Sequence, residues 1–178
     1  MKFSGSGISK KIEVAANIAI IFVVALIAVR IFDPDLFYRK APQPSPPPAT
    51  IDVGNKVDLP AVDWSSHEKT VVMVLREGCH FCSASAPFYK KLVQAADKAP
   101  GVHLMAVLPQ DVPEAKKYLD TLGVPVGDIQ HGDLGTLKIA GTPTLLLVDR
   151  TGVVKKVWVG QLDGQGEAEV MSTVGLAN

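Results

Sequence analysis

Cysteine is scarce in this chain. Its 178 residues include only Cys79 and Cys82, which excludes a framework of several disulfides and a four-cysteine zinc site. An excess of charge is also missing, because Lys plus Arg and Asp plus Glu both number 18. Without a strong positive field, the chain is not typical of proteins that bind nucleic acid. The sequence shows no internal repeat.

The apolar content points to a membrane segment. Hydrophobic residues make up 47% of the chain and its mean hydropathy is +0.22, values that exclude a disordered polar chain. In residues 14–32, 17 of 19 side chains are apolar or aromatic, about the length needed to cross ~30 Å of hydrocarbon. We therefore expect a basic N-terminal segment at residues 1–13 and an uncleaved transmembrane anchor at residues 14–32. A cleaved signal peptide or a buried helix is less favoured, because the run is long and no clear cleavage site follows it.

The sequence indicates the orientation of this anchor less directly than its position. Three basic residues precede the apolar run and three follow it, so the positive-inside count is tied. The basic cluster before the first apolar segment resembles a signal anchor. We expect a single-pass protein of the bacterial cytoplasmic membrane, with the N-terminus in the cytoplasm and the C-terminal domain facing the periplasm or cell exterior.

A proline-rich linker is expected at residues 33–50. Five of the seven residues at 42–48 are proline, which holds the chain extended at roughly 3.1 Å per residue and makes a stalk of about 20 Å. Beside a membrane span, this segment is better interpreted as a spacer than as a ligand for an aromatic groove. Of the 18 basic and 18 acidic residues, 6 and 3 lie in residues 1–41, leaving 12 and 15 in the rest of the chain. The domain predicted at residues 51–178 is therefore mildly acidic.

Within residues 51–178, short apolar runs typical of strands alternate with amphipathic runs typical of helices. Strands are expected at residues 71–75, 102–108, 144–148 and 153–159, and helices at 79–99, 111–122 and 167–174. The second of these helices begins at the capping-box-like pair Asp111 and Glu114 and is closed by Gly123. This order predicts an α/β fold, with a mixed central sheet and helices on both of its faces.

The sequence Cys79-His80-Phe81-Cys82 falls where the first predicted strand gives way to a helix. A thiol at a helix N-terminus is near free N–H groups, which stabilise the thiolate that attacks disulfides. The second sulfur lies one turn further on, where it can resolve a mixed disulfide. We assign Cys79 as the nucleophile and Cys82 as the resolving thiol.

Two other interpretations of the pair remain. One is a static disulfide, and the other is half of a zinc site completed by histidines. The histidines available for such a site are His67, His80, His103 and His131.

Two further features make the chain resemble the thioredoxin superfamily. Pro87 stands five residues after Cys82, where thioredoxins kink the active-site helix, and Gly141-Thr142-Pro143-Thr144 precedes an apolar strand. The resemblance implies a thioredoxin-like fold in which Pro143 is a cis-proline beside the cysteines. It also implies that Thr142 offers its backbone to the substrate peptide.

The anchor, the stalk, the extra strand and helix at residues 102–123 and the sequence T-L-L-L-V-D-R-T-G-V-V resemble the TlpA and ResA type of extracytoplasmic thiol:disulfide oxidoreductases. This resemblance covers residues 51–176, with two departures. Gly78 stands where a Trp usually precedes the first cysteine, and Met73 stands where thioredoxin carries a buried acid. Glu77 is a candidate substitute for that acid.

His80 and Phe81 replace the Gly-Pro pair common in thioredoxins. A protonated His80 would stabilise the thiolate and make the disulfide more oxidising. We therefore treat His80, Phe81 and Glu77 as modulators of the active site, with Glu77 equally consistent with a solvated surface acid.

These features predict an enzyme that exchanges disulfides with protein clients through the redox-active Cys79–Cys82 disulfide, with no other cofactor and no metal. The resemblance implies clients such as the cysteines of apocytochrome c or of copper sites, and a transmembrane electron donor or acceptor; the direction of exchange is open. The alternative is a thioredoxin-like copper metallochaperone that binds Cu(I) through the cysteines and His131, although its relatives usually separate their cysteines by three residues. A peroxiredoxin and a non-catalytic scaffold are weaker alternatives.

Overall fold

The computed structural model describes residues 6–32 and 50–176. The chain divides into two compact units, Met1–Pro47 and Pro48–Asn178. Of the predicted linker at residues 33–50 only residue 50 is described, and of the predicted basic segment at residues 1–13 the described part, residues 6–13, is helical.

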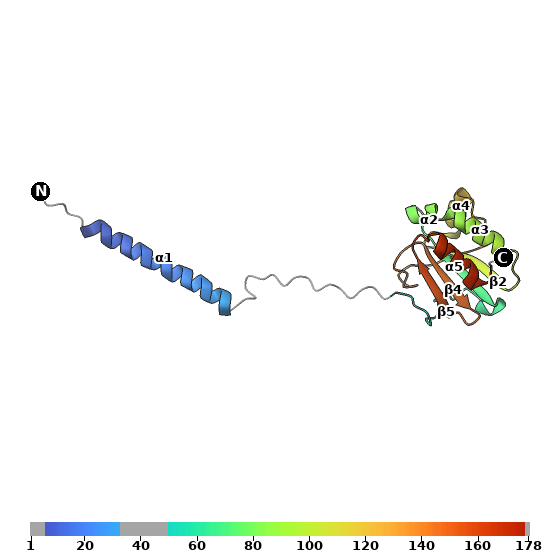
Figure 1. The fold of residues 1–178 in the computed structure, drawn as a ribbon, viewed down its shortest axis with the longest axis horizontal. Helices are drawn as coiled ribbons and strands as arrows, with labels where there is room; N and C mark the ends of the chain where they lie inside the picture. The colour runs from blue at the N-terminus through green and yellow to red at the C-terminus, as the bar shows by residue number, and fades with distance from the viewer. Residues whose placement is uncertain (1–5, 33–49, 177–178) are drawn as a thin grey trace. The chain divides into compact units, whose positions relative to one another are not determined.

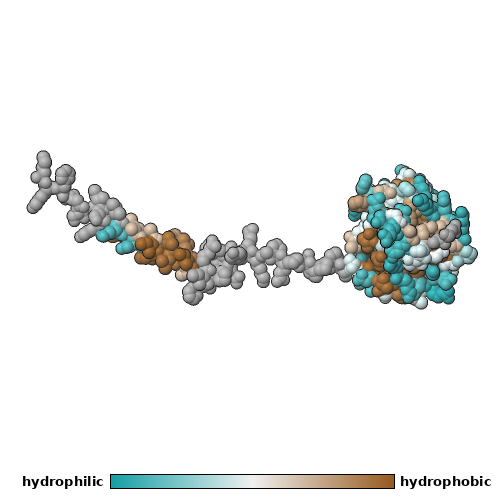
Figure 2. Space-filling model, in the orientation of Figure 1, coloured by the Kyte–Doolittle hydropathy of each residue, from teal (hydrophilic) through white to brown (hydrophobic). Residues whose placement is uncertain are grey.

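The first unit contains one helix, α1 (Ser6–Phe32), drawn in blue in Figure 1. Apolar side chains gather on its described middle part, including Ile21 and Phe22, which are 68% and 67% exposed (Figure 2). Within the part of the chain that the structure describes, no helix meets the length and apolarity needed to cross a membrane. The structure does not describe the side chains of residues 29–32, which form the end of the predicted anchor. The anchor therefore stays a prediction.

The second unit is built on a five-stranded mixed sheet with the order β3-β2-β1-β4-β5. Its strands are β1 (Lys69–Val74), β2 (Val102–Leu108), β3 (Asp128–His131), β4 (Thr144–Asp149) and β5 (Val154–Val159). The three strands β1, β2 and β3 run parallel, and β4 is antiparallel to both β1 and β5. The predicted mixed sheet is confirmed, and β3 is an additional strand that was not among those predicted.

The helices of this unit are α2 (His80–Ala84), α3 (Ala86–Ala96), α4 (Val112–Leu122) and α5 (Gly164–Val174), with a short 3-10 helix, η2 (Trp64–Ser66). The single helix predicted at residues 79–99 is wrong, because the chain breaks between α2 and α3 at Ser85. Pro87 lies in the first turn of α3, where its missing N–H costs no helical hydrogen bond. The kink expected at this proline is thus a full change of helix.

The second predicted helix begins and ends close to the expected residues. Gly123 closes α4 in the left-handed conformation, with φ of 66°. Asp111 is the N-cap residue, but its side chain makes no capping hydrogen bond, so the predicted capping box does not form. Pro113 lies in the first turn of α4, where a backbone N–H has no partner within the helix, so its missing N–H costs no helical hydrogen bond.

Each face of the sheet carries its own apolar cluster. One cluster contains residues from α2, α3, α4 and α5, packed against alternate strand residues such as Met73 and Leu145. On the other face, residues such as Val72 and Leu146 pack against Ile51, Trp64 and the loop residue Leu137. The flanking helices are confirmed, but the long ones share one face, whereas extended chain, η2 and a loop cover the other. Helices on both faces were expected.

Candidate functional site

The cysteine pair lies directly after the central strand β1. Cys79 is the N-cap residue of α2, and its Sγ accepts a hydrogen bond from the backbone N–H of Cys82 at 3.2 Å. Gly78, just before it, has φ of 76°, a conformation that glycine adopts without strain. The turn therefore aims the sulfur of Cys79 at the free N–H groups of the following helix.

The two thiols are free and differ in accessibility. Cys79 is 8% exposed and Cys82 is fully buried. Burial raises the pKa of the Cys82 thiol to about 11, and its hydrogen bond with Cys79 adds to this rise. Burial opposes ionisation of Cys79 too, but hydrogen bonds with Cys82 and Thr142 outweigh it and lower the pKa of Cys79 below its ordinary value. Cys79 is therefore the sulfur suited to attack.

The loop before β4 lies against the pair, as the resemblance implied. The Thr142–Pro143 peptide bond is cis. The Sγ of Cys79 donates to the carbonyl oxygen of Thr142 at 3.2 Å, which joins two segments 63 residues apart in the sequence. The carbonyl of Pro143 accepts from the N–H of Gly160 at 2.7 Å, and Thr144 Oγ1 donates to the Gly141 carbonyl at 2.7 Å. These bonds fix the loop that carries Thr142.

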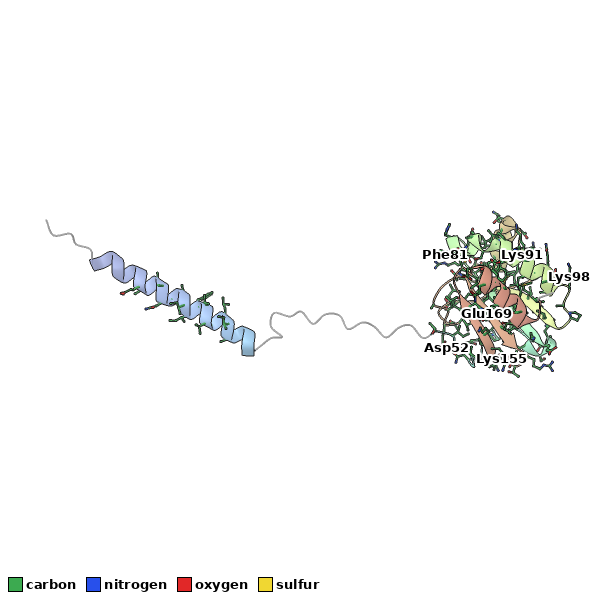
Figure 3. All side chains as sticks on the ribbon, in the orientation of Figure 1. Asp52, Phe81, Lys91, Lys98, Lys155 and Glu169 are labelled. Carbon is green, nitrogen blue, oxygen red and sulfur yellow. The ribbon has the colours of Figure 1, made fainter. Side chains whose placement is uncertain are left out.

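The predicted modulators lie around this turn. Phe81 is 55% exposed beside the cysteines and is labelled at the edge of the domain in Figure 3. The ring of His80 contacts that of Phe81 edge-on, with ring centroids 5.6 Å apart. Glu77 is exposed, and its negative charge contributes to raising the pKa of Tyr118. Glu77 thus acts at the surface beside the site, while Met73 is fully buried in the core below it.

Two tyrosines that the sequence analysis did not assign to the site lie near the thiols. Burial raises the pKa of both Tyr89 and Tyr118, and the negative charge of either cysteine thiolate raises it further. The hydroxyl of Tyr118 lies 3.5 Å from Ser83 Oγ. Sequence periodicity placed Tyr118 on the apolar face of its helix, but nothing in the pattern connected α4 to the cysteines.

The structure also places histidines that were considered as metal ligands. Among residues 6–32 and 50–176, no group of three or more His, Cys, Asp or Glu side chains could hold a metal ion. His131, the proposed third copper ligand, ends β3, and its Nδ1 lies 3.3 Å from the carbonyl oxygen of Gln110. His67 and His103 stack on one another elsewhere, with centroids 4.3 Å apart.

Comparison with solved structures identifies the fold. One neighbour is a protein assigned as the thiol:disulfide interchange protein DsbE of Chlorobium tepidum, 24% identical, with a TM-score of 0.54, over 71% of this chain and 99% of its own. Another is a thiol-disulfide isomerase of Corynebacterium glutamicum, 22% identical, with a TM-score of 0.51, over 72% of this chain and 94% of its own. No family model and no curated protein matches the sequence.

A third neighbour is the thioredoxin domain of a thiol-disulfide oxidoreductase from Bacteroides vulgatus, 17% identical, with a TM-score of 0.52, over 70% of this chain and 98% of its own. The fold of residues 51–176 is therefore thioredoxin-like. Its site is a dithiol at a helix N-terminus beside a cis-proline loop. At this site Cys79 is 8% exposed and Cys82 is fully buried.

Proposed function

We propose that this protein is a thiol:disulfide oxidoreductase whose reactive residue is Cys79. The observation that carries this proposal is the contrast between the two thiols. Cys79 is partly accessible and its pKa is lowered, whereas Cys82 is buried and its pKa is raised. Since the thiolate is the attacking species, this contrast favours exchange through Cys79 first.

The proposed reaction moves two electrons between the pair and a client disulfide. The Cys79 thiolate attacks one client sulfur, forms a mixed disulfide and releases the other client sulfur as a thiolate, which takes up a proton. The Cys82 thiol then loses its proton and attacks Cys79 Sγ, which forms the Cys79–Cys82 disulfide and releases the second client thiol. The client is reduced and the protein is oxidised; the reverse sequence oxidises a client dithiol.

Phe81 and Thr142 flank the reacting sulfur and are suited to a polypeptide client. The ring of Phe81 offers apolar surface beside Cys79. Thr142, whose carbonyl meets Cys79 Sγ, lies next to the sulfur at which the client's cysteine would arrive. Clients of this site are therefore proteins with a disulfide exposed on an extended, partly apolar segment.

The proposal includes the membrane anchor at residues 14–32 and an extracytoplasmic domain, which rest on the sequence. Thiol–disulfide exchange by a membrane protein on that side of the bilayer requires a redox partner that resets the pair. Precursors of cytochrome c and of copper sites are the client classes to test first. Both present cysteines that must be reduced before their cofactor is attached.

Trapping in membranes tests the function directly. In the Cys82→Ala variant the mixed disulfide on Cys79 cannot be resolved, so the client should stay attached and appear as a band that disappears on reduction. The double variant Cys79→Ala, Cys82→Ala is the matched control and should trap nothing. Equal trapping by Cys79→Ala with Cys82 intact would contradict the assignment of Cys79 as the nucleophile.

A further inference from the structure

A groove of about 740 Å³ lies at the end of the domain away from the cysteine pair. Three lysines line it: Lys69 at the start of β1, Lys91 on α3 and Lys98 after α3. Apolar side chains line the rest, among them Ala95, Met171 and Leu176. The groove therefore combines a cationic rim with an apolar floor.

The charge of the groove is opposite to that of the domain. Three lysines face one acid, Glu68, in a domain with 12 basic and 15 acidic residues. Lys91 and Lys98 are exposed and, among the described residues, neither takes part in an ion pair. Lys69 Nζ donates to the carbonyl of Val174 at 3.3 Å, so only part of its capacity to donate is used.

Two elements connect the groove to the site and fix their separation. The strand β1 begins at Lys69, in the groove, and ends just before the turn that holds Cys79. The 11 residues of α3 start beside the pair and end at the groove, a length of roughly 16 Å. Phe81 and Lys98 accordingly lie at opposite sides of the domain in Figure 3.

We propose that this groove docks the domain on an anionic phospholipid surface. The inference rests on the membrane anchor of the proposed function. Lipid phosphates would bind Lys91 and Lys98 at the rim, while the apolar floor would face the glycerol and upper acyl region. With the groove against the bilayer, Cys79 faces away from it, toward clients in solution.

Anionic lipid is the occupant that fits both the charge of the groove and the proposed anchor. The bilayer that holds such an anchor is present at high effective concentration, so even a weak attraction of a few lysines is sufficient. A free phosphate ion would satisfy the rim but leave the apolar floor exposed to water.

Energy transfer in proteoliposomes can test this docking with the full chain. Trp64 and Trp158 are the only two tryptophans, and both lie in the thioredoxin-like domain. Transfer from them to dansyl-labelled lipid headgroups therefore reports how closely the domain approaches the bilayer. We expect higher transfer with phosphatidylglycerol than with phosphatidylcholine, and a loss of the difference at high salt.

The variant Lys91→Glu, Lys98→Glu should lower the fraction docked on phosphatidylglycerol at least about tenfold. The control Lys56→Glu, Lys117→Glu makes the same change in net charge outside the groove and should dock like the native chain. Equal transfer with both lipids, or no effect of the groove variant, would overturn the proposal; the first result would favour an acidic protein as the occupant.

Two readouts separate this inference from the proposed function. Flotation of the protein with the vesicles reports the anchor independently of the groove, and disulfide exchange with a soluble peptide reports the cysteine pair. If the protein floats and exchanges disulfides normally but the energy transfer does not respond to lipid charge, only the docking inference is contradicted. Loss of flotation or of exchange in the native chain would instead contradict the proposed function.

Discussion

Cys79 and Cys82 carry the same chemical group, and their surroundings give the two thiols opposite pKa shifts. Cys79 Sγ accepts the N–H of Cys82 at 3.2 Å, a bond that favours its thiolate. Cys82 lies fully inside the apolar cluster that also contains Met73. No carboxylate therefore occupies the strand position beneath the pair, and the backbone of α2 supplies the stabilisation of the thiolate.

The first prediction concerns the rate of alkylation by iodoacetamide as a function of pH. Because the pKa of Cys79 is lowered, its thiolate fraction rises at lower pH than that of an ordinary thiol, and we expect one modification with a midpoint below the ordinary cysteine value of about 8.5. Cys82 should stay unmodified in the folded protein until strongly alkaline pH, since its pKa is about 11. The Cys79→Ala variant should lose the early modification, and an early midpoint retained in that variant would refute the assignment.

The second prediction concerns His80, which is exposed and follows Cys79 directly. A protonated imidazole stabilises the thiolate and so the reduced form, and we expect a reduction potential above the ~−270 mV of thioredoxin. Replacing His80 with Ala should make the potential more negative by roughly 10–30 mV. Equilibration with glutathione buffers measures this.

The variant His67→Ala is the control for this measurement, because His67 stacks on His103 away from the pair. It should leave the potential unchanged. A His80→Ala potential equal to that of the native protein would show that the imidazole does not influence the pair.

At the scale of elements, the sequence predicted best those segments whose pattern is local. The strand β2 was predicted with its observed bounds, Val102–Leu108, because it is an apolar run interrupted only by His103 and bounded by turn residues. The cis-proline loop was predicted by its order relative to C-x-x-C, and its contact with Cys79 is observed.

Other elements depend on contacts that no local pattern contains. The strand β3 has only four residues, Asp128–His131, and none is fully buried; its pairing with β2 defines it as a strand. One face of the sheet is covered by the segments that carry Ile51 and Trp64. A short apolar segment in the sequence does not specify where such residues pack.

The third prediction tests how that extended chain is held. A Cβ placed on Gly152, in the β4–β5 turn, would lie 2.9 Å from Trp64 Cδ1, and its φ is +79°. Gly152→Ala should therefore destabilise the domain by roughly 2–4 kcal/mol, through backbone strain and displacement of the indole. Urea unfolding measures the loss.

Gly54 provides the matched control. Its φ is +91°, but a Cβ there would meet nothing within 4 Å. Gly54→Ala should cost only the backbone strain, on the order of 1 kcal/mol. If the two variants were equally destabilised, the packing of Trp64 on Gly152 would contribute nothing to stability.

At the scale of the whole molecule, the chain combines an independent domain with an apolar helix. Both apolar clusters draw their residues from Ile51–Leu176. Every cysteine and every described residue around the pair also lies in that range. The zero net charge of the sequence is therefore an average over a basic N-terminal region and an acidic domain, each with its own environment.

This separation leads to the fourth prediction, for a chain that starts at Pro48. Because no cluster loses a residue, the shortened protein should unfold at the same urea midpoint as the full chain in detergent and exchange disulfides with a soluble peptide at a similar kcat/KM. It should no longer float with vesicles, since the apolar run at residues 14–32 is gone.

A full chain that remains soluble without detergent would contradict the anchor. A shortened chain that folds but exchanges slowly would show that the first unit contributes to the reaction as well as to location, which the contacts around Cys79 do not predict.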